Sequence, residues 1–165
     1  MNLARFPRRR YTEGQTPIES VPRFSQVLGG PNIYIKRDDL LGLTAGGNKT
    51  RKLEFLVADA LIKDADTLIT CGAVQSNHCR LTLSAAVKEG MKCRLVLEER
   101  VPGSFDPKAG GNNFIFNLLG VEDIRVVPGG LDMMVAMQEV AEEVSAAGRK
   151  ALCLIRYTRA RPWQA

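Results

Sequence analysis

The stretch Gly46-Gly47-Asn48-Lys49-Thr50-Arg51-Lys52-Leu53-Glu54 opens the regular alternation of helices and strands in this chain. It places Lys49 at the start of a predicted helix, directly after two glycines, which allow a sharp turn and a close approach of the backbone to a ligand. The first turn of a helix carries partial positive charge, and this field, away from water, favours the neutral form of an amine. A neutral lysine amine condenses with an aldehyde, so Lys49 is a candidate nucleophile. The alternative is a solvated surface lysine after an ordinary turn.

Helical and extended patterns alternate from this point to the end of the chain. Helices are predicted over 53–61, 76–89, 113–119 and 133–147, and strands over 67–71, 93–97, 124–127 and 151–155. Such alternation is typical of a parallel sheet with helices on both faces. The first 47 residues are rich in proline and arginine and contain one clear strand, at 33–36. We therefore predict an α/β fold in three layers, preceded by an N-terminal segment.

A second segment, Thr70-Cys71-Gly72-Ala73-Val74-Gln75-Ser76-Asn77-His78, lies between an apolar strand and a helical pattern. Ser76 or Asn77 is a suitable N-cap for that helix. The turn offers backbone amides, a hydroxyl, a carboxamide and an imidazole together, which suits an anion such as a carboxylate. Ligands of parallel sheets bind at the carboxyl ends of the strands, where this turn lies. A plain capped turn without a ligand is the alternative.

These two segments, together with Ile35-Lys36-Arg37-Asp38-Asp39, resemble the family of 1-aminocyclopropane-1-carboxylate deaminase and D-cysteine desulfhydrase. Leu3-Ala4-Arg5-Phe6-Pro7 and Thr16-Pro17-Ile18-Glu19 are also similar, and the resemblance extends over residues 3–150. Members of this family are fold-type-II enzymes that depend on pyridoxal 5'-phosphate (PLP), akin to the β subunit of tryptophan synthase. The resemblance implies that residues 48–150 form the small α/β domain and that residues 1–47 belong to the large domain.

The resemblance also implies roles for individual residues. Lys49 is the lysine that holds PLP, and Asn48 belongs to the same cofactor site. Ser76 and Asn77 bind the substrate carboxylate; Ser76 is a candidate catalytic residue, and Asn77 lies against the cofactor ring. His78 stands where relatives carry glutamine or histidine, and is a candidate substrate ligand or general acid/base. For His78, a hydrogen bond to the backbone at the helix start is the alternative.

The function implied is that of a PLP-dependent lyase or deaminase acting on a small amino acid. D-cysteine desulfhydrase, which yields pyruvate, sulfide and ammonia, is the first expectation, and 1-aminocyclopropane-1-carboxylate deaminase and L-cysteate sulfo-lyase are the alternatives. A homodimer is expected from the family. Two other classes stay open: a non-catalytic α/β fragment, and a small basic module that binds through its arginine-rich ends. The low aromatic content of 6% argues against base stacking, so no nucleic-acid partner is expected.

The chain has 165 residues, about half the length implied by the family, so a second half with the loop that cups the PLP phosphate is expected to be missing. Residues 149–165 contain five of the 23 basic residues and none of the 18 acidic ones. We therefore interpret residues 151–165 as a divergent basic tail, produced by a shifted or prematurely ended reading frame. A basic arm for an acidic partner is the alternative. The chain alone is expected to be inactive.

The composition is ordinary for a globular protein, with 45% hydrophobic and 25% charged residues. No apolar run approaches the roughly 18 residues that span a bilayer, and no apolar segment follows the N-terminal arginines as it does in a signal peptide. Cys71, Cys79, Cys93 and Cys153 are interpreted as buried thiols in a reducing compartment. A single histidine argues against zinc. We predict a cytoplasmic protein without metal or membrane contact.

Overall fold

The computed structural model describes residues 2–154. In chain order its elements are η1 (Leu3–Arg5), β1 (Ile18–Ser20), α1 (Pro22–Leu28), β2 (Tyr34–Lys36), η2 (Asp38–Leu40), α2 (Thr50–Ile62), β3 (Thr67–Ala73), α3 (Asn77–Lys88), β4 (Lys92–Glu99), α4 (Asn112–Leu118), β5 (Asp123–Pro128), α5 (Met133–Ala146) and β6 (Ala151–Leu154). The basic tail was predicted over residues 151–165. Of these, residues 155–165 lie outside the described part of the chain.

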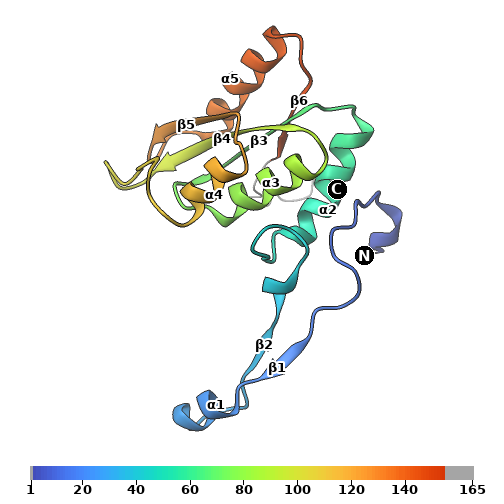
Figure 1. Ribbon diagram of the computed structural model, residues 1–165, viewed down its shortest axis with the longest axis vertical. Helices are drawn as coiled ribbons and strands as arrows, with labels where there is room; N and C mark the ends of the chain where they lie inside the picture. Colours follow the sequence, from blue (N-terminus) through green and yellow to red (C-terminus); the bar gives the residue numbers. More distant parts are fainter. Residues whose placement is uncertain (1, 155–165) are drawn as a thin grey trace, which may run out of the picture.

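Four strands form one sheet in the order β5-β4-β3-β6, and every pair is parallel (Figure 1). The register places Leu68 of β3 opposite Cys93 of β4 and Leu152 of β6. The strand predicted at the end of the alternation is therefore part of the sheet as β6. The predicted parallel α/β fold is confirmed.

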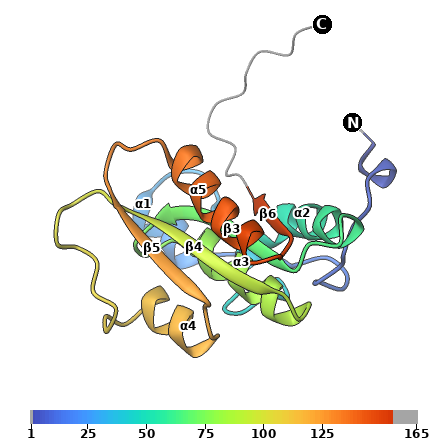
Figure 2. The same ribbon diagram turned by 90° about the horizontal axis from the view of Figure 1, so that it is seen from above.

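Side chains that alternate along the central strands divide the core into two layers. Leu68 and Leu95 pack with residues of α2, α3 and α4, and Phe116 of α4 is fully buried there. Ile69 and Val96 point to the opposite face and pack with α5. Figure 2 shows α5 on one side of the sheet and α3 and α4 on the other. The predicted arrangement with helices on both faces is thus confirmed, because alternate residues of a strand face opposite sides.

The part of the N-terminal segment from β1 to β2 forms a separate arm that extends away from the sheet (Figure 1). Its strands β1 and β2 pair antiparallel, with Ile18 opposite Lys36. Between them, α1 begins at Pro22 and ends at Gly29, which has a φ of 60°. The strand predicted at 33–36 is present as β2, whereas the prediction did not include β1 and α1. The arm exposes apolar side chains, among them Val27, which is 82% exposed.

Glu54 of α2 fastens the start of the chain to the α/β core. Its carboxylate is 1% exposed, forms an ion pair with Arg8, and accepts hydrogen bonds from the backbone N–H groups of Tyr11 at 2.9 Å and Thr12 at 3.3 Å. A buried carboxylate is costly unless it is paired in this way. Residues 8–12 are therefore held against α2. The assignment of residues 1–47 to a larger domain stays a prediction.

Within residues 2–154, no helix combines the length and the apolar character needed to cross a membrane.

Candidate functional site

Lys49 lies at the start of α2, as the sequence predicts. It is the N-cap residue, with helical backbone angles (φ −68°, ψ −21°), and its side chain is half-buried. Its carbonyl accepts the N–H of Leu53 at 3.0 Å. In the part of the chain that the structure describes, Arg51 is ion-paired with Asp38, whereas Lys49 has no ion pair. Asn48 is exposed beside it.

The glycine pair before Lys49 allows a close approach, but to the chain itself. Gly46 and Gly47 have φ values of 60° and 129°. A Cβ on Gly46 would lie 1.8 Å from the carbonyl oxygen of Asp39, and Gly47 N–H donates to the carbonyl of Asp38 at 2.8 Å. Gly46 is needed because residues 38–39 pack against the turn, and the predicted approach of this turn to a ligand stays a prediction.

Three contacts bring the two predicted segments together, and all of them join the start of α2 to the start of α3. The Arg80 guanidinium donates to the carbonyl of Gly46 at 3.2 Å, and a Cβ on Gly47 would lie 3.1 Å from the side chain of Leu81. Lys52 Nζ lies 3.3 Å from His78 Nε2. The Lys49 helix mouth and the Ser76 turn therefore lie side by side, although 26 to 34 residues separate the hydrogen-bonded partners in the sequence.

Basic side chains gather in this region: Lys52 and Arg80 lie near Lys49, while Arg51 is paired with Asp38. Neither α2 nor α3 has an acidic residue in its first turn, and Arg80 is only 6% exposed. Burial lowers the pKa of the Arg80 guanidinium, and among the described residues its Nε has no hydrogen-bond partner. Two helix N-termini with basic side chains form a site that suits an anion. The sequence analysis did not include Arg80, because local patterns do not reveal burial.

Ser76 is the N-cap of α3, which confirms one of the two residues predicted for that place. Its Oγ accepts the N–H of Cys79 at 3.3 Å. Gly72 leaves the necessary room, since a Cβ there would lie 2.3 Å from Ser76 Oγ. Asn77 follows as the first helical residue and is exposed. The predicted roles of Ser76 and Asn77 in substrate binding stay predictions, and both side chains lie at the carboxyl end of β3.

His78 points inward and is 3% exposed. Besides Lys52, its Nε2 lies 3.1 Å from Thr70 Oγ1, and its Nδ1 lies 3.5 Å from Thr82 Oγ1. These three contacts of His78 are with side chains. The contacts link α2, β3 and α3 through one ring. The roles of substrate ligand and general acid/base stay predictions.

The Ser76 turn is also tied to α4, through residues that the sequence analysis did not select. The backbone N–H of Asn112 donates to Gln75 Oε1, and Asn112 Nδ2 donates to Gln75 O, both at 2.8 Å. Asn112 Nδ2 also donates to Asn77 Oδ1 at 2.9 Å. The partners lie 35 to 37 residues apart in the sequence, and the only local signal was a helix start predicted one residue later, at Asn113.

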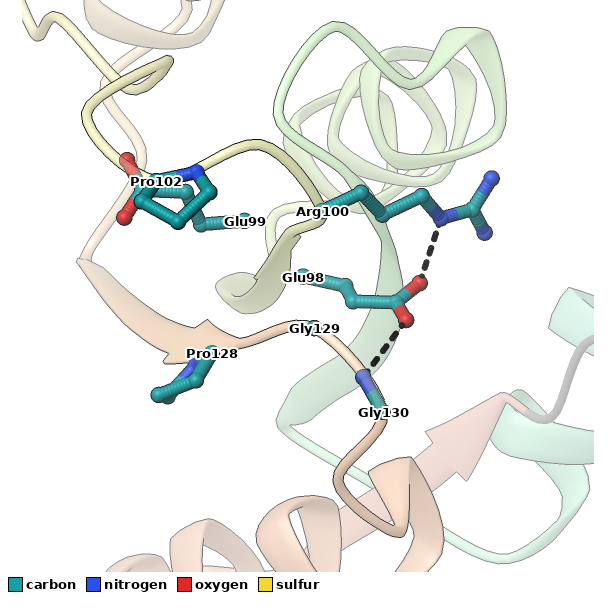
Figure 3. Close-up of a pocket in the computed structure, with 7 residues that line it drawn as sticks. All are labelled: Glu98, Glu99, Arg100, Pro102, Pro128, Gly129 and Gly130. Atoms are coloured by element: carbon teal, nitrogen blue, oxygen red, sulfur yellow. Dashed lines mark hydrogen bonds and ion pairs between the residues drawn. The ribbon is translucent and has the colours of Figure 1, made fainter.

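A hollow of about 500 Å³ lies at the edge of the sheet where β4 and β5 end (Figure 3). Its lining residues are Glu98, Glu99, Arg100, Pro102, Pro128, Gly129 and Gly130. Glu98 accepts from Arg100 Nε at 2.7 Å and from the N–H of Gly130 at 3.3 Å. The hydrogen bond from Arg100 holds the pKa of Glu98 below its usual value. Two carboxylates line this hollow, and Glu98 already accepts from Arg100 Nε and Gly130 N–H, so the hollow suits an anion less than the Ser76 turn does.

The cysteines are thiols, and Cys71, Cys79 and Cys93 are buried as predicted, while Cys153 is partly exposed. Burial raises the pKa of the Cys93 thiol. Within residues 2–154, no three His, Cys, Asp or Glu side chains gather as they do around a metal ion.

Comparison with known proteins adds two findings. Residues 9–164 match the family of pyridoxal-phosphate dependent enzymes. A solved structure described as that of an ACC deaminase homologue is 42% identical in sequence and superposes with a TM-score of 0.81. The match covers 93% of this chain and 45% of that chain, so the present chain spans less than half the length of the homologue.

Proposed function

The chain belongs to the family of pyridoxal-phosphate-dependent enzymes, and we propose that it carries the cofactor lysine and the carboxylate site of a lyase or deaminase that acts on a small amino acid. The observation that supports this proposal best is the convergence of the Lys49 helix mouth and the Ser76 turn. One segment offers an amine and the other offers hydrogen-bond donors, and basic side chains lie near both.

The residues present fit the cofactor. PLP carries an aldehyde and a phosphate, and bound in a site it stabilises the negative charge that develops at the amino acid's α-carbon. Lys49 offers a half-buried amine without an ion pair among residues 2–154, which suits the aldehyde. The hydroxyl of the next residue, Thr50, is buried and has no hydrogen-bond partner in the described part of the chain. First turns without acidic residues favour anionic groups nearby.

The chain's own residues divide the work between the two segments. Ser76 and Asn77 bind the substrate carboxylate through their hydroxyl and carboxamide, which fixes the orientation of the α-carbon. Lys49 would hold the cofactor through its amine, and the same amine, once it is free again, would be the base that takes the α-proton in a β-elimination. Arg80 supports the turn before Lys49 through the carbonyl of Gly46. Asn48 lies beside Lys49 at the cofactor site.

For the reaction itself we propose D-cysteine desulfhydration: D-cysteine and water yield pyruvate, sulfide and ammonia. A second candidate is 1-aminocyclopropane-1-carboxylate deamination, because the solved homologue is described as an ACC deaminase homologue. L-cysteate sulfo-lysis is the third reaction of this group. All three substrates are small amino acids with a free carboxylate, so the same Ser76 turn serves each of them.

The 165 residues alone are proposed to turn over none of these substrates at a useful rate. They span 45% of the homologue, and we propose that the remaining length supplies the groups around the cofactor phosphate. The exposed apolar side chains of the arm, such as Ile18 and Val27, support the proposal that further protein covers this arm. A chain without the catalytic apparatus would be the non-catalytic fragment considered above.

We further propose a homodimer in the cytoplasm. The dimer follows from the family, and the four thiols suit a reducing compartment.

To test the proposal, this chain is joined to the part of the ACC deaminase homologue that lies outside the match. The product has about the length of the homologue. This joined protein, called the fusion below, is assayed with D-cysteine and with 1-aminocyclopropane-1-carboxylate in the presence of PLP. The proposal predicts turnover of at least one substrate by the fusion and none by the 165-residue chain. Turnover by the fusion with Lys49→Ala would contradict the role of Lys49. Equal turnover by the short chain would show that its catalytic apparatus is complete.

A further inference from the structure

The turn that carries Ser76 and Asn77 is held from outside by one residue, Asn112, at the start of α4. Its side-chain Nδ2 donates to two acceptors of the turn, Gln75 O at 2.8 Å and Asn77 Oδ1 at 2.9 Å. Its backbone N–H donates to Gln75 Oε1 at 2.8 Å. Gln75 Nε2 in turn donates to the carbonyl of Gly110 at 3.2 Å. The turn and the loop before α4 are thus connected in both directions.

The loop before α4 is shaped for this contact. Gly111 has a φ of 69°, a conformation that favours glycine. A Cβ at that position would lie 2.8 Å from Gln75 Oε1, closer than real Cβ contacts. A side chain on residue 111 would therefore displace the Gln75 carboxamide. The approach of the two loops depends on this glycine as well as on Asn112.

The contact between Asn112 and Asn77 fixes which end of the Asn77 carboxamide faces Asn112. A carboxamide has an acceptor end, its oxygen, and a donor end, its NH₂ group. Asn112 Nδ2 occupies the acceptor end of Asn77, because it donates to Oδ1. The donor end of Asn77 consequently lies on the side away from Asn112. Asn77 is exposed, so this NH₂ group is accessible to a ligand.

We propose that Asn112 is a positioning residue that fixes the Asn77 carboxamide with its N–H donors directed to the ligand. A carboxylate accepts hydrogen bonds and cannot donate them, so a rotated Asn77 would present its oxygen to the substrate and repel it. The identity of the ligand rests on the proposed function. The orientation of Asn77 does not, and it is measured separately below.

The first measurement follows the carboxamide protons of Asn77 and Asn112 by NMR in the 165-residue chain. In the unmodified chain, Asn112 protons are expected to exchange with water more slowly than Asn77 protons, by roughly two- to tenfold, the worth of one net hydrogen bond. Asn112→Asp replaces the donor by an acceptor of the same size. The Asn77 protons are then expected to exchange more slowly than in the unmodified chain, because Asn77 must now donate to residue 112.

Asn117→Asp is the matched control. Asn117 lies in the same helix, and its Nδ2 donates to the carbonyl of Pro107 at 2.9 Å, away from the turn. This variant is expected to leave both sets of protons unchanged. Asn77 protons that exchange more slowly than those of Asn112 in the unmodified chain, or that exchange no more slowly in Asn112→Asp, would overturn the proposal. Should that variant fail to fold, Asn112→Ala decides: Asn77 signals that do not move in the alanine variant would equally overturn it.

The second measurement concerns binding, in the fusion. Asn112→Asp is expected to raise KM for D-cysteine by roughly two- to tenfold with little change in kcat, because a misoriented carboxamide weakens carboxylate binding. Asn117→Asp is expected to leave both constants unchanged. An unchanged KM in Asn112→Asp would overturn the positioning role. An unmodified fusion that is inactive would count against the proposed function, while the exchange measurement would still decide the orientation of Asn77.

Discussion

Two turns at the same edge of the sheet follow the same architecture and have opposite chemistry. The turn after β3 leads into α3, and the turn after β5 leads into α5. The first is capped by the neutral hydroxyl of Ser76 and lies beside the buried Arg80. The second is capped by Asp132, and the Glu98 carboxylate accepts the N–H of Gly130 there (Figure 3).

A strand–turn–helix unit therefore does not by itself make an anion site. Both turns present backbone donors at the carboxyl ends of parallel strands, where ligands bind in such folds. In the turn after β5, the protein's own carboxylates occupy these donors. In the turn after β3 the cap is the neutral hydroxyl of Ser76, and the helix mouth that carries Lys49 is adjacent. The side chains therefore decide which of the two turns can bind a carboxylate.

The largest effect is expected from removal of the lysine amine. In the fusion, Lys49→Ala should abolish turnover of both D-cysteine and 1-aminocyclopropane-1-carboxylate, because the other amine near that helix mouth, that of Lys52, lies against His78. The control is a lysine outside both turns. Lys108→Ala, in the loop after β4, should retain the activity of the unmodified fusion. The measurement is the release of ammonia, which all the candidate reactions share.

A smaller effect is expected from the Ser76 turn. Ser76→Ala and Asn77→Ala should each lower kcat/KM of the fusion by roughly ten- to a hundredfold, which corresponds to about 1.5–3 kcal/mol for a hydrogen bond to a charged group. PLP should be retained. Glu98→Gln, in the turn region after β5, should leave kcat/KM unchanged. If both alanine variants kept full catalytic efficiency, the carboxylate site would have to lie elsewhere.

The third prediction concerns stability of the turn. Gly72→Ala places a Cβ 2.3 Å from Ser76 Oγ and 3.0 Å from Cys79 Sγ, which forces the cap to move. We expect a loss of about 1–3 kcal/mol in the free energy of unfolding. Urea unfolding of the 165-residue chain measures it as a lower midpoint. Gly110→Ala, where nothing lies within 4 Å, is the control; equal midpoints for the two variants would contradict the packing described here.

The smallest effect is expected from Glu98. Its pKa is lowered in the folded state, chiefly by the hydrogen bond from Arg100. A carboxyl with a lowered pKa stabilises the fold above its usual pKa of 4.5 and loses this contribution as the pH falls. Glu98→Gln should therefore cost less than about 1 kcal/mol near neutral pH, since Arg100 is well exposed. Unfolding curves recorded from neutral to acidic pH should converge; a difference that grows in acid would contradict the assignment.

Local patterns were sufficient for the α/β domain. The helix from Asn77 to Lys88 and the strand from Thr67 to Ala73 were predicted nearly in full, because helical spacing and apolar runs are properties of adjacent residues. The arm was predicted less well: β1 has three residues and an exposed pattern, which leaves no periodic signal. The segment of α1 shows no helical spacing of apolar residues. Its first residue is Pro22, which suits the first turn of a helix but does not by itself predict one.

The sequence indicated which segments to consider for the site, but not the contacts that join them. Lys49, Ser76 and Asn77 stand in recognisable segments, so their neighbourhood could be expected. The contact of Arg80 with Gly46, and that of Asn112 with Asn77, join residues 34 and 35 positions apart. Such contacts depend on how helices pack, which one sequence does not specify. His78 is the clearest example: its residue type predicts a role at the site, but not that the ring lies between Lys52, Thr70 and Thr82.

The account rests most directly on the amine of Lys49, and chemical trapping measures it. The fusion is mixed with PLP, reduced with borohydride, and digested, and the modified lysine is located by mass spectrometry. The account predicts that the label lies mainly on Lys49 and disappears in Lys49→Ala. Label found mainly on Lys52, one turn further along α2, or on any other lysine would contradict the assignment of the cofactor site.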